Sequence, residues 1–123
     1  TIAEELEFRR KRSGHLLSKM RALSAPLAAY LQNDLWLANA RHANAMAQRL
    51  ADGLSSAEGI DLRRSPSGNQ LFMGMDPALK QRLFDAGAYF QDWPDEGPTA
   101  VRMVTAFNTL EPDVDAVIAA AHS

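Results

Sequence analysis

The sequence contains no cysteine among its 123 residues. This absence excludes disulfide bonds, thiolate metal ligands and a cysteine nucleophile, and it fits a reducing cytoplasm. No apolar run is long enough to span a bilayer, and the charged segment 1–12 does not have the pattern of an export signal. We therefore expect a cytoplasmic protein that makes no contact with a membrane.

Motifs for metal binding, phosphate binding and serine catalysis are also missing. The sequence has no glycine-rich phosphate loop and no serine elbow. Its three histidines, His15, His42 and His122, are far apart in the chain, so no metal-ligand spacing is present. We expect no metal site. His42 is expected at the edge of the core, and His15 in an exposed loop where an anion contact is an alternative.

The overall composition is that of one globular unit. Hydrophobic residues make up 46% of the chain and charged residues 23%, which is enough apolar material for one core and argues against disorder. The chain begins at Thr1, without a methionine, and enters a helical pattern at once. We expect a piece of a longer protein.

The first half of the chain has a helical pattern. Residues 2–12 are good helix formers, Ser13-Gly14 interrupts the pattern, and Ser24-Ala25-Pro26 is expected to open a second helix. A long amphipathic helix is predicted over residues 34–54, because apolar residues recur there at spacings of three and four. The predicted apolar stripe consists of Trp36, Ala40, Ala43, Ala47, Leu50 and Leu54.

The second half changes to the alternating pattern of strands. Strands are predicted around residues 60–62 and 71–75, then over 88–93 and 99–107, with helices over 78–86 and from Glu111 onward. The expected fold class is α+β, with a helical segment 1–55 and a small domain 56–123. In that domain, helices cover a largely antiparallel sheet in the order β-β-α-β-β-α. The expected core includes Leu71, Met73, Val101 and Met103.

Positive charge is concentrated near the start of the chain. Residues 1–21 carry a net charge of +3, whereas residues 22–123 carry −5. Such a cluster suggests a nucleic-acid backbone, a membrane surface, a bound phosphate, or solvent alone. One alternative is a nucleic-acid-binding module that uses Arg9–Arg12, although the body is acidic and its predicted strands do not interleave aromatic and basic residues.

Arg102 lies in a predicted strand between small apolar residues. The alternation places Val101, Met103 and Thr105 on one face and Arg102 on the other. A guanidinium in this setting needs an anion, either the carboxylate of a substrate or a structural acid such as Asp92. The pattern alone favours the structural ion pair.

Two long blocks of the sequence resemble a known enzyme family. These blocks, RRKR-G-H-L-SK-R-LSA and NARHANAMA-RLA, together with residues 84–93 and 99–120, are similar to the C-terminal third of low-specificity L-threonine aldolases. The resemblance covers nearly the whole chain. It implies a pyridoxal-phosphate enzyme of the aspartate-aminotransferase fold type that reversibly cleaves L-threonine or L-allo-threonine into glycine and acetaldehyde.

The resemblance also implies site residues and missing parts. Arg102 matches the arginine that binds the α-carboxylate of the amino-acid substrate, which reverses the preference for a structural pair. Arg21 resembles the arginine that reaches the cofactor phosphate of a neighbouring subunit, Lys11 resembles a lysine near it, and Lys19 is an alternative to Arg21.

The family holds its cofactor through a Schiff-base lysine in a larger N-terminal domain, and none of Lys11, Lys19 and Lys80 has the context of that lysine. The isolated chain is therefore expected to be inactive. The expected partners are its own N-terminal domain and further copies in a dimer or tetramer, and a non-catalytic dimerisation domain is a third alternative.

Overall fold

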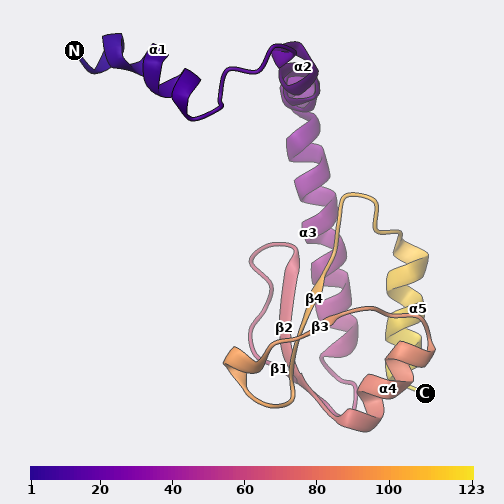
Figure 1. Cartoon of the computed structure of the whole chain (residues 1–123). Coiled ribbons are helices and arrows are strands. Elements are labelled where there is room, and N and C mark those ends of the chain that lie inside the picture. Colours follow the sequence, from indigo (N-terminus) through magenta and orange to yellow (C-terminus); the bar gives the residue numbers. More distant parts are fainter. The chain divides into compact units, whose positions relative to one another are not determined.

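The structure is a computed structural model that describes residues 1–123, and it contains two compact units (Figure 1). The first unit is Thr1–Trp36 and the second is Leu37–Ser123. None of the helices combines the length and the apolar composition that are needed to cross a membrane.

The first unit is helical. Helix α1 covers Ile2–Arg12, as the sequence predicts, and helix α2 covers Met20–Leu31 and is followed by a short 3-10 turn, η1, at Gln32–Asp34. The prediction that α2 opens at Ser24–Pro26 is wrong, because Pro26 lies inside the helix. The preceding residues are good helix formers, and the helix continues through Pro26 although that residue lacks an N–H and its ring crowds the carbonyl one turn earlier.

No residue of the first unit is buried. Its two helices therefore have no core of their own, and its large apolar side chains all face outward. These exposed side chains are Ile2, Leu6, Phe8, Leu16, Leu17, Met20, Leu23, Leu27, Tyr30, Leu31, Leu35 and Trp36.

The long helix α3 spans Leu35–Leu54, within one residue of the predicted start. Only its C-terminal part is buried, so Trp36 and Ala40 are exposed although the periodicity places them on the apolar stripe. The period identifies an apolar face of a helix but not the length over which other elements cover it. The buried residues of α3 are Ala43, Met46, Ala47, Leu50, Ala51 and Leu54.

Four strands form one antiparallel sheet in the order β1-β2-β4-β3. The strands are β1 at Ile60–Leu62, β2 at Gln70–Met75, β3 at Gln91–Asp92 and β4 at Ala100–Val104. The predicted α+β class is confirmed. The third and fourth strands are shorter than predicted, and β3 is soon followed by a second 3-10 turn, η2, at Pro94–Glu96, where proline ends an extended edge strand.

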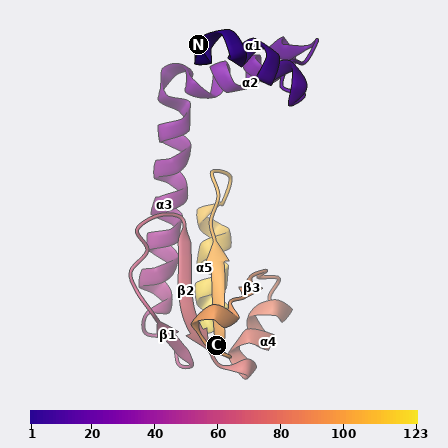
Figure 2. The ribbon, with the colours of Figure 1, turned by 60° about the vertical axis from the view of Figure 1, so that its left-hand side comes forward.

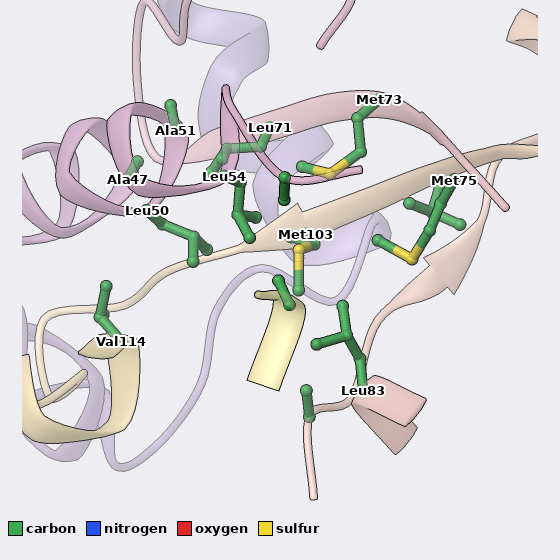
Figure 3. Close-up of a cluster of buried hydrophobic side chains, with 14 of the residues drawn as sticks. Ala47, Leu50, Ala51, Leu54, Leu71, Met73, Met75, Leu83, Met103 and Val114 are labelled. Atoms are coloured by element: carbon green, nitrogen blue, oxygen red, sulfur yellow. The ribbon is translucent and has the colours of Figure 1, made fainter. Parts of the chain in front are cut away.

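One face of the sheet is covered by α3, by α4 at Pro77–Asp85 and by α5 at Glu111–Ala121 (Figures 1 and 2). Figure 3 shows the core between these layers, in which apolar side chains of the strands meet those of the three helices. The predicted core residues Leu71, Met73, Val101 and Met103 are all buried. No helix of the second unit lies over the other face of the sheet, and this is the face that carries Arg102 (Figure 2).

Helix α5 is held to its neighbours by two arginines. Arg49 of α3 donates hydrogen bonds of 2.8 and 2.9 Å to the two carboxylate oxygens of Asp115. These hydrogen bonds keep the pKa of Asp115 below its ordinary value. At the other end, Arg82 of α4 donates to the carbonyl oxygens of Ala120 and Ala121, which lack helical partners at a C-terminus.

Candidate functional site

Arg102 stands in the middle of a row of three side chains across the sheet. Its cross-strand partners are Phe72 on β2 and Gln91 on β3. The predicted alternation along β4 is confirmed, since Val101, Met103 and Thr105 are buried on the core side and Arg102 lies on the opposite face. The strand thus presents the guanidinium on the side of the sheet that the helices leave uncovered.

The guanidinium of Arg102 is held by uncharged groups. Its Nη2 donates a hydrogen bond of 2.5 Å to Oε1 of Gln91, and its Cζ lies 4.6 Å from the centroid of the Trp93 ring. Its Nε is buried and has no hydrogen-bond partner, and no other buried side-chain nitrogen or oxygen in the chain is left in this state. The side chain is therefore fixed in place and keeps donor capacity for an acceptor.

The alternative prediction, an ion pair between Arg102 and Asp92, is wrong. Asp92 forms an ion pair with Lys80 of α4 instead, and Arg102 takes part in no ion pair within the chain. The reason is the alternation along β3, because Gln91 faces Arg102 and the next side chain must point to the other side of the sheet. The positive charge of Arg102 thus remains unneutralised by any carboxylate of this chain.

A hollow of about 320 Å³ opens beside Arg102, and we call it the Arg102 hollow. Its volume lies at the small end of the range for ligand pockets, roughly 300–1,000 Å³. Apart from Gln91 and Arg102 its walls are apolar or aromatic, and Tyr89 is 90% exposed at its edge. One cation among apolar walls suits a small carboxylic acid. The lining residues are Tyr89, Phe90, Gln91, Arg102 and Val104.

Sequence reasoning missed Gln91 and Trp93. The ring of Trp93 meets that of Phe72 edge to face, with centroids 5.8 Å apart, and Arg64 lies 4.3 Å above Phe72. Arg64 is itself paired with Glu96 at 2.9 Å. The only sequence feature that points to these two residues is the FQDW segment before a turn. Which residue of β3 faces Arg102 depends on the strand register, and the local pattern does not define that register.

In the first unit, two of the three predicted cofactor-binding residues lie together. Lys19 and Arg21 both line a hollow of about 440 Å³ at the start of α2, and neither takes part in an ion pair. We call it the α2 hollow. Two cations beside the N-terminus of a twelve-residue helix fit a phosphate group, because the helix end adds free N–H groups and a positive dipole. Lys11 lies on α1 and does not line this hollow.

The remaining candidates have structural contacts. Arg9 of the basic stretch pairs with Glu5 at 2.6 Å, and His15 lines a separate surface hollow beside α1. His42 is half-buried and its ring nitrogen lies 2.7 Å from the carbonyl oxygen of Thr109, which confirms its position at the edge of the core. The ring of His122 contacts the carbonyl oxygen of Gly53. No three potential ligands among His, Asp and Glu are grouped to hold a metal ion.

Two curated proteins are similar to the chain in sequence. A low-specificity L-threonine aldolase of a Pseudomonas strain is 33% identical over 110 residues, which are 89% of this chain and 31% of that protein. One from Pseudomonas aeruginosa is 35% identical over 96 residues, covering 78% of this chain and 28% of that protein. The chain thus spans less than a third of the length of these relatives. No family model matches it.

Solved structures share the fold. The cystine C-S lyase C-DES, in complex with its product cysteine persulfide, has a TM-score of 0.56 at 18% identity over 68% of this chain and 23% of its own, and a C-DES mutant with glycine covalently linked to its PLP cofactor gives the same values. A threonine aldolase of Leishmania major has a TM-score of 0.54 at 26% identity, over 65% of this chain and 23% of its own. The resemblance noted in the sequence is thereby confirmed.

Proposed function

Since the chain resembles the C-terminal part of low-specificity L-threonine aldolases, we propose that it forms that part of a pyridoxal-phosphate-dependent aldehyde-lyase. The proposed reaction is the cleavage of L-threonine or L-allo-threonine into glycine and acetaldehyde. Within this enzyme the chain would contribute contacts to the substrate carboxylate and to the cofactor phosphate. The comparisons do not favour the nucleic-acid alternative.

The observation that carries the proposal is the state of Arg102. A guanidinium that lies beside a small hollow, has no carboxylate partner and keeps a buried Nε without an acceptor is suited to bind a carboxylate with two parallel hydrogen bonds. When bound, pyridoxal phosphate supplies the electron sink for the bond cleavage. The role of Arg102 is to bind the amino acid and orient the Cα–Cβ bond that breaks.

The decisive variant is Arg102→Lys in the complete protein. Lysine keeps the charge but loses the planar fork, so we expect kcat/KM for L-threonine to fall roughly 10- to 150-fold, the equivalent of one hydrogen bond to a charged group. Cofactor retention and the thermal unfolding midpoint should stay near those of the wild type. Steady-state kinetics, cofactor absorbance and a melting curve measure the three quantities.

A matched control is Arg63→Lys, which makes the same exchange at the end of β1, where the arginine pairs with Asp61 on the surface. This control should leave kcat and KM unchanged. If Arg102→Lys instead lowers the melting temperature and leaves turnover at all threonine concentrations unchanged, Arg102 has a structural role and the proposal fails.

For the cofactor phosphate, we propose Lys19 and Arg21, with Lys11 as a less direct contributor. The support is their shared position around the α2 hollow, in contrast to the position of Lys11 on α1. Arg21→Ala and Lys19→Ala should each weaken retention of pyridoxal phosphate during dialysis, followed by absorbance. Arg12→Ala removes a neighbouring charge that does not line this hollow, and it should retain cofactor like the wild type.

The rest of the active site is proposed to come from outside this chain. Lys80, the only lysine of the second unit, is engaged by Asp92, and the exposed apolar side chains of the first unit require a covering surface, such as the N-terminal domain or another copy. The chain 1–123 alone, supplied with pyridoxal phosphate and L-threonine, should release no acetaldehyde. Release at the rate of the complete protein would show that the chain holds the catalytic lysine.

A further inference from the structure

Gln91 is the single side chain that accepts a hydrogen bond from the guanidinium of Arg102. Because arginine has no acceptor, the amide oxygen of Gln91 must be the atom that faces it, and the amide NH₂ group is directed elsewhere. An amide oxygen orients the guanidinium through a hydrogen bond without neutralising its charge. A carboxylate at the same position would form an ion pair and occupy the donors that a ligand needs.

Trp93 makes a second contact with the same group. The Cζ of Arg102 lies over its ring, 4.6 Å from the centroid, a favourable arrangement of a cation and an aromatic face. The ring meets Phe72 edge to face, and the main chain of Trp93 is held by the backbone hydrogen bond of 2.8 Å from its N–H to the carbonyl oxygen of Ala100. One polar contact and one aromatic contact thus restrain the guanidinium together.

We propose that Gln91 and Trp93 are positioning residues for the carboxylate-binding arginine, an inference that rests on the function proposed for Arg102. Gln91 orients the fork while it accepts from only one nitrogen, Nη2, so that the remaining N–H groups stay free for the ligand, and Trp93 supports its face. The identity of residue 91 as an amide, rather than an acid, is what keeps the site selective for anions.

The charge requirement makes Gln91→Glu the sharpest variant. Its carboxylate has the length and geometry of the amide, and so it pairs with Arg102 and competes with the ligand. In the complete, cofactor-loaded protein we expect the Kd of glycine, measured by calorimetry, and the KM of L-threonine to rise about tenfold or more. The thermal unfolding midpoint should not fall, since the new ion pair adds a contact. Gln81→Glu is the matched control, because Gln81 lies on α4, over the opposite face of the sheet.

Two further variants separate positioning from simple stabilisation. Gln91→Met removes the hydrogen bond at nearly constant length, and Trp93→Leu removes the aromatic face. Each should raise the glycine Kd several-fold. Trp93→Phe keeps an aromatic face and should restore most of the affinity, and it also serves if Trp93→Leu does not fold.

The outcomes distinguish this inference from the proposed function. If Arg102→Lys leaves the glycine Kd unchanged, the proposed role of Arg102 fails and the inference fails with it. If Arg102→Lys raises the Kd while Gln91→Met and Gln91→Glu leave it unchanged, only the positioning role is overturned, whether or not their melting temperatures fall. A raised Kd in both Gln91 variants, with the Gln81→Glu control unaffected, supports the inference.

Discussion

Helix α3 offers a test of where the fold is stabilised, because the same side chain occurs at both ends in opposite environments. Leu54 is fully buried at 0% exposure and packs in the core shown in Figure 3, whereas Leu35 is 46% exposed. Replacing Leu54 by alanine removes apolar contacts and leaves a cavity, which together cost about 3–5 kcal/mol of unfolding free energy. A domain of this size has roughly 5–15 kcal/mol in total, so the loss is a large fraction.

The matched exchange Leu35→Ala should change the unfolding free energy of the chain 1–123 by about 0.5 kcal/mol or less, as expected for an exposed position. Urea titrations followed by far-ultraviolet circular dichroism give both values. If Leu35 is covered in the complete protein, Leu35→Ala should cost about 1.5–3 kcal/mol there, the worth of burying a leucine. Equal costs of the two exchanges in the chain 1–123 would refute the division of α3 into a buried and an exposed part.

Two further predictions concern the contact between α3 and α5. A Cβ at Gly53 would overlap Cδ1 of Ile118 and lie 2.7 Å from its Cγ1. Gly53→Ala should therefore lower stability by about 1–3 kcal/mol despite the better helix propensity of alanine, and Ile118→Ala in the same chain should recover part of that loss. A stabilised Gly53→Ala variant in urea unfolding would contradict this. Since Arg49 depresses the pKa of Asp115, the ionised carboxylate stabilises the fold above the ordinary carboxyl pKa of about 4, and the contribution is lost as the pH falls through the depressed value. The melting temperature of Asp115→Asn should therefore lie below that of the wild type at pH 7, and the difference between the two melting temperatures should narrow below a pH of about 4. A difference that does not depend on pH would contradict the ion pair.

The sequence predicts the elements well where its periodicity is long. Helix α1 follows from its helix-forming composition, since none of its residues is buried. Helix α3 and the core residues of β2 and β4 follow from spacing, because burial on one face imposes a period of 3.6 or 2. The sequence misplaces the start of α2, because proline is typical of a first helical turn but Pro26 lies inside this helix. The exposure of Trp36 was missed because the pattern contains no information about which surface, in this chain or another, covers a given turn.

The candidate site was predictable only in part. Arg102 stands out locally as a charge within an apolar strand, but its proposed binding role comes from the resemblance, since the pattern alone favours a structural ion pair with an acid such as Asp92. The actual neighbour is one residue earlier, and a shift of one residue exchanges the faces of a strand. Gln91 and Trp93 are joined to Arg102 by pairing between β3 and β4, and nothing in the segment that contains them indicates that register.

The two residues of β3 show how this register separates two opposite requirements. The edge strand needs a tie to the helical layer, which the acid at position 92 provides through Lys80 on the side of Val101. The proposed binding site needs an arginine that is oriented and still charged, which the amide at position 91 provides on the other side. If the acid stood at position 91, it would neutralise Arg102 and leave Lys80 without its partner. The order of Gln91 and Asp92 therefore places the stabilising ion pair on one face of the sheet and leaves Arg102 charged on the other, where we propose that the ligand binds.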